Sequence, residues 1–290
     1  MSLKNFKEAL IEKIIFLSGI ASIILVILIF IFLAKEGLSL FKSVHLGDFL
    51  LGRRWHPISE PPQFGVLPLI LGSLFVTLGA AVISVPMGIA SAIYIAEVAP
   101  PRMKEILKSG IELLAAIPSV VLGFIGMTTL VPFVKHHLNL PTGLTAFSGS
   151  VMLAFMAMPT IVSIAEDALT AVPQKYKEAA LALGATRWQA IHRVILRAAS
   201  SGIVAAVMLG IGRVVGETMA VMMITGNAVR MPTSLFQPVR TLTATIAAEM
   251  GETVRGSAHY HALFAIGIVL FVITFVINLI ADWAVHRKLK

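Results

Sequence analysis

The sequence contains no cysteine among its 290 residues, and only 13% of its residues are charged. Without cysteine the chain has no disulfide, no cysteine metal site and no thiol nucleophile. The small share of charged residues excludes an ordinary soluble domain, in which about a quarter of the residues are charged. The G-x-x-x-x-G-K-[ST] motif of the P-loop is also missing, so the chain does not cradle nucleotide phosphates in that manner. We expect no catalytic residue, no cofactor and no metal site.

Long apolar segments fill most of the chain, in which 57% of the residues are hydrophobic. A helix needs about 20 residues to cross a hydrocarbon core of about 30 Å. Six nearly uncharged runs are long enough, and they predict an all-α integral membrane protein with six transmembrane helices. These runs are residues 14–34, 67–96, 113–134, 144–165, 202–225 and 262–281. The first run lacks a signal-peptide cleavage site, so we interpret it as a retained anchor.

Positive charge lies mainly between the apolar runs. The net charge of +8 would suggest nucleic acid in a soluble protein, but here Lys and Arg lie in loops, where they set orientation, and nucleic-acid binding is disfavoured. With the amino terminus inside, fourteen Lys and Arg fall on the cytoplasmic side and eight on the opposite side. The positive-inside rule therefore predicts that both termini and the loop 172–200 are cytoplasmic.

Prolines interrupt three of the predicted spans: Pro86, Pro118 and Pro159. Such breaks are tolerated in a membrane where neighbouring helices or a water-filled path satisfy the freed carbonyls. A single proline is more often a packing kink. Three together favour a bundle of kinked helices that lines a path.

The long loop between the fifth and sixth runs carries most of the remaining polar residues. Within it, residues 242–250 predict a short half-helix, and we expect Glu249 and Glu252 to pair with Arg240 or Arg255. The histidine clusters at 136–137 and 259–261 have no carboxylate at ligand spacing, so we interpret them as membrane-interface residues.

One polar stretch, residues 172–197, separates two apolar runs and predicts a helix, a sharp turn and a second helix. Pro173 can begin the first helix and Gly184 can end it in a left-handed conformation. Thr186 and Gln189 have the spacing of a capping box, which begins the second helix.

The first of these two helices carries small apolar residues on one face. Tyr176, Ala179, Ala180 and Leu183 follow helical spacing and predict a shallow stripe that another surface could approach closely. An isolated pattern of this kind more often belongs to an amphipathic helix resting on the membrane.

The details of this loop resemble the EAA loop of ABC-importer permeases. The resemblance rests on Glu178, Ala179, Ala180 and Gly184, followed after nine residues by Val-Ile-Leu. In that family the loop binds the ATPase. Where the family usually has proline after the leucine, this chain has Arg197, so we expect a straighter exit from the second helix.

Arg213 and Glu217 lie four residues apart in the otherwise apolar fifth run, and a continuous helix would place them on one face. At 1.5 Å per residue Arg213 lies about 16 Å into the bilayer, where a bare charge costs about 3 kcal/mol or more. Gly210, Gly212 and Gly216 permit close helix approach on one side and free space for a ligand on the other. The pair marks a pathway, or it is an ion pair that only fixes packing.

The same stretch, GIVAAVMLGIGRVVGETMAV, resembles the PstC-type permease subunits of phosphate-specific ABC importers, within the binding-protein-dependent permease family. The resemblance extends from about residue 55 to the end of the chain. Further matching stretches are FGVLPLILGSLFVT, IYIAEVAP, LLAAIPSVVLGFIGM and PVRTLTATIAAEMGE.

The resemblance implies a MetI-like bundle at residues 67–290, preceded by an amino-terminal segment at 1–66. It further implies that Arg213 and Glu217 take part in phosphate passage. The implied partners are a second (A-type) permease subunit, two cytoplasmic ATP-binding subunits and an extracytoplasmic phosphate-binding protein. The implied location is the bacterial or archaeal cytoplasmic membrane.

Three alternatives stay open at this stage. A proton-coupled secondary transporter could use Glu217 as a relay, but it would have no reason to carry the capped loop at 172–200, and no inverted repeat is visible. An ABC permease for another oxyanion would suit Arg213 equally well. A structural membrane scaffold would leave Arg213 unexplained.

Overall fold

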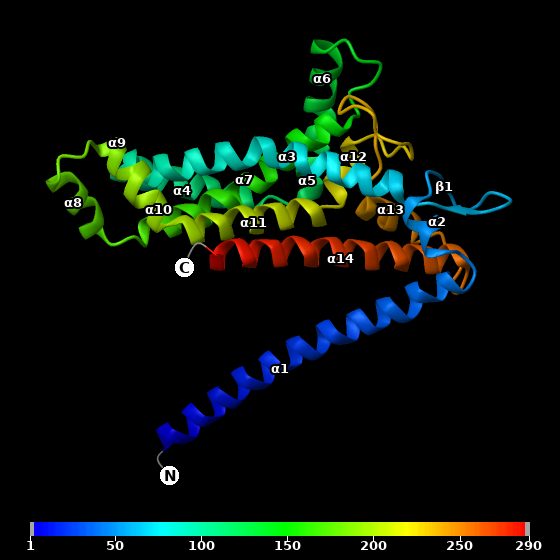
Figure 1. Cartoon of the computed structure of the whole chain (residues 1–290), viewed down its shortest axis with the longest axis horizontal. Helices are drawn as coiled ribbons and strands as arrows, with labels where there is room; N and C mark the ends of the chain where they lie inside the picture. The colour runs from blue at the N-terminus through cyan, green and yellow to red at the C-terminus, as the bar shows by residue number, and fades with distance from the viewer. Residues whose placement is uncertain (1–2, 288–290) are drawn as a thin grey trace.

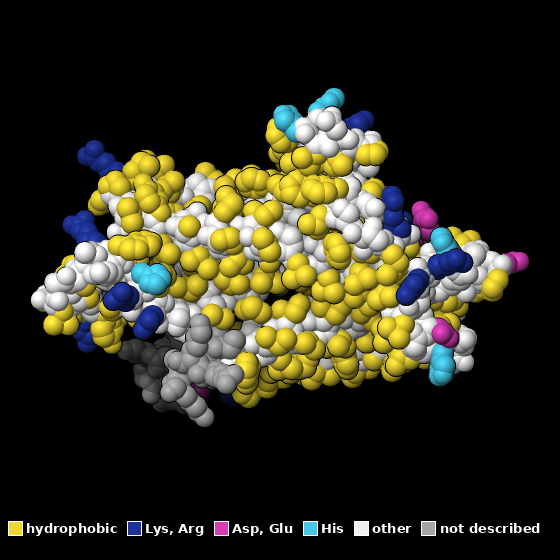
Figure 2. All heavy atoms as spheres, turned by 45° about the horizontal axis from the view of Figure 1, so that its top comes forward, with side chains coloured by type: hydrophobic (Ala, Val, Ile, Leu, Met, Phe, Trp, Pro, Cys, Tyr) yellow, Lys and Arg dark blue, Asp and Glu magenta, His cyan; other side chains and the backbone are white. Residues whose placement is uncertain are grey.

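The computed structural model describes the backbone of residues 3–287 and the side chains of residues 11–280 and of Trp283. Apart from the first, its long helices run side by side along the long axis of the molecule (Figure 1). Five of the described helices are long and apolar enough to cross a membrane, and a bent helix pair makes up to six. The six expected spans are confirmed in this sense. Apolar side chains cover the middle of the molecule, and Lys and Arg gather towards its ends (Figure 2).

The first span, α1 (Leu3–Leu38), packs against the last, α14 (Ala258–Arg287), near one end of the molecule. Gly37 permits this contact, because a Cβ there would lie 2.6 Å from the Ile268 side chain. Away from this end α1 diverges from the other helices (Figure 1). The apolar side chains along α1 are therefore largely exposed in the single chain.

Short elements follow α1 and close the same end of the molecule. They are η1 (Ser39–Lys42), α2 (Leu46–Leu51), β1 (Trp55–His56) and β2 (Gln63–Phe64), and the two strands pair antiparallel. Their buried side chains, among them Phe49, Trp55 and Phe64, pack on Leu263 and Ile266 of α14.

The central core lies between α3 (Leu67–Ile93), α7 (Ala146–Thr170) and α11 (Ser200–Gly216). Ile161 of α7 is fully buried and lies between two glycines of the flanking helices. A Cβ on Gly88 would lie 2.8 Å from Ile161, and one on Gly210 would lie 2.4 Å from it. Glycine at both positions thus allows α3 and α11 to approach α7 closely.

The third span begins later than the predicted residues 113–134. Helix α4 (Pro101–Ala116) includes Leu113 and ends before Ile117, which is extended because the residue before a proline avoids helical dihedrals. The span itself covers residues 119–137 and consists of α5 (Ser119–Ile125), the π-turn η3 (Gly126–Leu130) and α6 (Val131–His137). Pro86 and Pro159, in contrast, lie inside α3 and α7.

The polar loop forms the predicted helix, turn and helix. The first helix is α8 (Gln174–Ala182), and the second consists of α9 (Arg187–Ala190), the π-turn η4 (Ile191–Ile195) and α10 (Leu196–Ala198). The chain then bends by 72° between α10 and α11. The exit is thus bent, and the expectation that Arg197 makes it straighter than the family's proline does stays a prediction.

The fifth span is not the continuous helix predicted over residues 202–225. Helix α11 ends at Gly216, Glu217 is extended with φ −69° and ψ 130°, and α12 (Met219–Ile224) begins two residues later. The half-helix predicted at 242–250 is confirmed as α13 (Leu242–Glu249). Thr243 of α13 donates a hydrogen bond of 3.0 Å to the Glu217 carbonyl oxygen, and this tertiary contact stabilises the break.

Candidate functional site

Helix α11 has one packed face and one open face. Ala206, Gly210 and Val214 follow each other at four-residue spacing and are buried against the neighbouring helices. The exposed residues of α11 lie on the adjoining face and are Leu209, Gly212, Arg213 and Gly216. A Cβ on Gly212 or Gly216 would have no atom within 4 Å. The predicted division, with packing on one side and free space on the other, is therefore confirmed.

Arg213 lies on the open face, about 20 Å along α11 from its start at Ser200. Among the described residues, no carboxylate oxygen lies within 4.0 Å of its guanidinium group. Glu217 is described and does not reach Arg213, so the two do not form the packing ion pair that helical spacing allowed. In this conformation the arginine is a cation without a bound counter-charge from the described residues.

Glu217 has a local structural role at the helix break. Its carboxylate Oε1 accepts a hydrogen bond of 3.3 Å from the backbone N–H of Ala220, in the first turn of α12. This N–H is one of the donors that a helix leaves without a partner at its start. The prediction that Arg213 and Glu217 project one helical turn apart is thus wrong, because α11 ends at Gly216 and Glu217 lies in the extended break before α12.

The turn between α8 and α9 has the predicted chemistry. Gly184 has φ +80°, the left-handed region that glycine adopts without strain. The N–H of Gly184 bonds to the carbonyl of Leu181, and the N–H of Ala185 bonds to that of Ala180, which is a Schellman motif. Thr186 and Gln189 form a capping box at the start of α9. Both helix ends at this corner are therefore fixed locally.

The predicted stripe on α8 is only partly exposed. Tyr176, Ala179 and Leu183 are open to solvent, as is Glu178 beside them. Ala180 is 9% exposed and faces inward. The exposed apolar surface of the loop instead extends to Trp188 of α9, which is 63% exposed. Helical spacing alone did not reveal that the second helix covers Ala180.

An ionic cluster joins α4 to α7 near the loop. Glu166 is 2% exposed, and its two oxygens lie 2.8 Å from the Nζ atoms of Lys104 and Lys108. Lys108 also lies 3.0 Å from Asp167. The hydrogen bond to Glu166, and to a smaller extent the one to Asp167, raises the pKa of Lys108 above its ordinary value. Sequence analysis missed this cluster, and its only signal was two acids at the end of a long apolar run.

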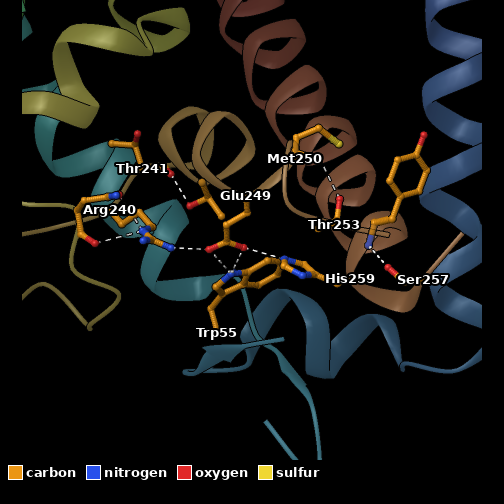
Figure 3. A network of polar contacts seen from close by, with 11 residues as sticks. Trp55, Arg240, Thr241, Glu249, Met250, Thr253, Ser257 and His259 are labelled. Atoms are coloured by element: carbon orange, nitrogen blue, oxygen red, sulfur yellow. Dashed lines mark hydrogen bonds and ion pairs between the residues drawn. The ribbon is translucent and has the colours of Figure 1, made fainter. Parts of the chain in front are cut away.

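A second polar network lies at the opposite end of the molecule (Figure 3). Glu249 at the end of α13 accepts hydrogen bonds from Trp55 at 3.0 Å and from Arg240 at 2.5 Å, and contacts His259 at 2.8 Å. The expected pairing of Glu249 with Arg240 is confirmed. His259 is a half-buried partner of Glu249 in the first turn of α14, and its place at the membrane interface stays a prediction. The four side chains line a cavity of about 780 Å³.

Neither network forms a metal site. No group of three or more His, Cys, Asp or Glu that could hold a metal ion occurs among the residues that the structure describes. The polar networks instead tie together elements that lie far apart in sequence, such as Trp55 and Glu249.

Comparison with known proteins relates this architecture to membrane transport. The family described as "Binding-protein-dependent transport system inner membrane component" matches residues 84–290. The chain is 42% identical to the probable ABC transporter permease protein YqgH of Bacillus subtilis, over 89% of this chain and 84% of that protein. It is 36% identical to the phosphate transport system permease protein PstC of Mesorhizobium japonicum, over 90% of this chain and 86% of that protein.

Solved structures support the same fold. The chain resembles a bacterial ABC transporter for alginate import with a TM-score of 0.66 and 18% identity, over 99% of this chain and all of that one. It resembles the inward-facing MetNI methionine ABC transporter with a TM-score of 0.61 and 20% identity, over 80% of this chain and 99% of that one.

Proposed function

The chain belongs to the family of binding-protein-dependent transport system inner membrane components, and we propose that it is a permease subunit of an ATP-driven importer of inorganic phosphate. Relatives named as phosphate permeases support this substrate, among them the PstC protein of Haemophilus influenzae, which is 37% identical over 86% of this chain. We propose residues 67–290 as the permease core and 1–66 as an amino-terminal extension of it.

The observation that carries the proposal is Arg213, a cation on the open face of α11 with no carboxylate partner among the described residues. An oxyanion entering the bilayer loses its hydration, and a fixed cation offsets part of that cost. Arginine suits phosphate because its planar fork can donate two parallel hydrogen bonds to one oxyanion. The open positions at Gly212 and Gly216 leave room for the anion beside it.

A second permease subunit completes the path in this proposal. The open face of α11 carries a charge and two glycines, and contact with lipid would leave Arg213 in hydrocarbon. A second, A-type subunit placed against this face encloses Arg213 and Glu217 in a polar path between the two chains. An extracytoplasmic phosphate-binding protein delivers the substrate to the outer end of that path.

The importer contains two ATP-binding subunits, each a separate chain, and one of them docks on the loop at 172–200 of this chain. The exposed side chains of Tyr176, Glu178 and Ala179 and the left-handed corner at Gly184 form the docking element. Ala180 supports it from inside by packing α8 onto the second helix. ATP is cytoplasmic, so this arrangement requires the loop and both chain termini on the cytoplasmic side of the bacterial or archaeal cytoplasmic membrane.

The test is Arg213→Gln in the complete importer, reconstituted in vesicles with binding protein and ATP. We expect phosphate uptake to fall at least tenfold while the subunits still copurify, since the open face loses a charge and no packing contact. Arg102→Gln, an exposed arginine on α4, serves as the matched control and should transport at the parental rate. Excess sulfate should not compete with phosphate. Parental uptake by Arg213→Gln would place the pathway elsewhere.

A further inference from the structure

The two helices of the loop at 172–200 attach to the rest of the molecule to different extents. The second helix buries Ala190, Ile191 and Ile195, and the last two belong to the core cluster at that end. The first helix, α8, buries only Ala180. Helix α8 also lies at the periphery of the molecule (Figure 1). Apolar packing therefore positions the second helix firmly and α8 weakly.

An ion pair supplies a second attachment for α8. The Nζ of Lys177 donates a hydrogen bond to Oε2 of Glu97, which lies 80 residues earlier in the chain. Glu97 belongs to the π-turn η2 (Tyr94–Val98), which continues α3 at its carboxyl end. The Lys177 side chain is 33% exposed, whereas that of Glu97 is 10% exposed. A carboxylate this buried is unfavourable without a partner, so the pair is more persistent than a fully exposed one.

The same π-turn contacts the other helix of the loop. Ile95 is 3% exposed and lies in one core cluster with Ile191 and Ile195 of η4. Turn η2 thus holds the second helix through apolar contact and α8 through Glu97. π-Turns inside helices frequently occur at functional sites, since they interrupt the regular hydrogen-bond ladder. The carboxyl end of α3 is therefore joined to α8 directly by the ion pair and indirectly through the second helix.

We propose that the Lys177–Glu97 ion pair is a positioning contact that transmits the movement of α8 to α3 during the ATPase cycle. The proposal rests on the function proposed above. It adds to the contact between the loop and the ATPase a second contact that transmits movement, and this second contact lies inside the chain. When the pair is broken, α8 still follows the ATPase, but α3 follows α8 only indirectly, through the second helix of the loop. ATP hydrolysis then continues with less transport for each ATP consumed.

The test compares two single variants that reverse one charge of the pair with a double variant that exchanges the two charges, all in the complete reconstituted importer. Glu97→Lys and Lys177→Glu each place two like charges together, and the double variant restores an opposite pair. We expect each single variant to retain its ATPase subunits and to lose at least fivefold in phosphate imported per ATP. The double variant should recover to within twofold of the parental ratio. Glu105→Lys on α4, an exposed acid in no ion pair among the described residues, is the matched control and should keep the parental ratio.

A second readout does not depend on the substrate. Because the chain lacks cysteine, spin labels can be attached to cysteines introduced at Gln174 on α8 and Met87 on α3, both exposed. In the assembled complex the distribution of distances between the two labels should stay narrow through the ATP cycle, and either single variant should broaden this distribution. The double variant should make the distribution narrow again.

Three results would overturn the proposal. One is that the single variants import as much phosphate per ATP as the parental complex and keep a narrow distribution of label distances. Another is an exchange variant as defective as either single variant, because the charges then act separately. The third is loss of the ATPase subunits from the single variants, because the pair then serves docking. If the parental complex hydrolyses ATP without importing phosphate, the proposed function fails, while the label distance still decides the role of the ion pair.

Discussion

At the residue scale, the charged side chains of the bundle fall into two groups, those with an oppositely charged partner and those without one among the described residues. Glu166 is almost fully buried and has two lysines within 2.8 Å, and Arg240 has Glu249 at 2.5 Å. Such groups have the hydrogen bonds that a buried charge needs, and they account for packing. Arg213 has no carboxylate partner among the described residues. Only a charge without a protein partner can bind a passing anion without first breaking an ion pair.

The role of Glu217 can be separated from that of Arg213 by comparing single and double variants. Glu217→Gln retains a carbonyl oxygen that can accept the Ala220 N–H bond, so we expect the helix break and the thermal stability to be preserved. Glu217→Ala removes this acceptor and should lower stability by about 1 kcal/mol. Thermal unfolding of the purified complex measures both.

Transport then decides whether the two charges act in the path. We expect Glu217→Gln to change the rate or the regulation of phosphate uptake more than it changes folding. The reason is that a carboxylate beside the phosphate anion disfavours tight binding of that anion. In the double variant Arg213→Gln, Glu217→Gln, phosphate uptake in vesicles with binding protein and ATP should stay at least tenfold below the parental rate. If the double variant transports at the parental rate, both residues are packing features.

At the element scale, the sequence predicted what is determined locally. The Thr186 capping box and the left-handed Gly184 involve residues three or four positions apart, and both are present. Apolar runs located the membrane-spanning helices, but they placed the start of the third span inside α4 and did not reveal the break at Glu217. A hydrogen bond from Thr243, 26 residues later, stabilises that break. No pattern in the sequence could reveal the contacts of Lys177 with Glu97 or of Trp55 with Glu249, which join residues 80 and 194 positions apart.

The corner at Gly184 yields a prediction for the whole loop. A Cβ at this position would meet no atom within 4 Å, so the cost of Gly184→Val within the chain is conformational, about 1 kcal/mol for a left-handed residue. Because the corner is exposed, the added side chain would also project into the proposed ATPase contact. We expect ATP hydrolysis with reduced phosphate import in reconstituted vesicles.

Gly110→Val provides the comparison for that variant. A Cβ added at Gly110 would also have no neighbour within 4 Å, but this glycine lies inside α4 without a positive φ. This variant should import phosphate normally. Normal import and normal ATPase binding in Gly184→Val would show that the corner does not have to be rigid.

At the scale of the whole molecule, the single chain leaves two surfaces open. Helix α1 diverges from the bundle with its apolar side chains exposed, and the Arg213 face of α11 is open (Figure 1). A sequence cannot show which exposed faces a second subunit covers, because an apolar residue facing lipid resembles one facing a partner. The described helices do show that α1 begins and α14 ends towards the end of the molecule that carries α8 and α9 (Figure 1).

The orientation of the whole molecule in the membrane can be tested in intact cells, since any introduced cysteine is unique in this cysteine-free chain. We choose Gln174 on α8 and His136 on α6, because both are exposed and neither forms an ion pair among the described residues. Lys177 would be a poorer choice, since it is bound to Glu97. A membrane-impermeant thiol reagent should label Cys introduced at His136 and should leave the Gln174 site unlabelled until the cells are lysed. The opposite labelling pattern would place α8 on the side without ATP, and the docking function of the loop would then be impossible.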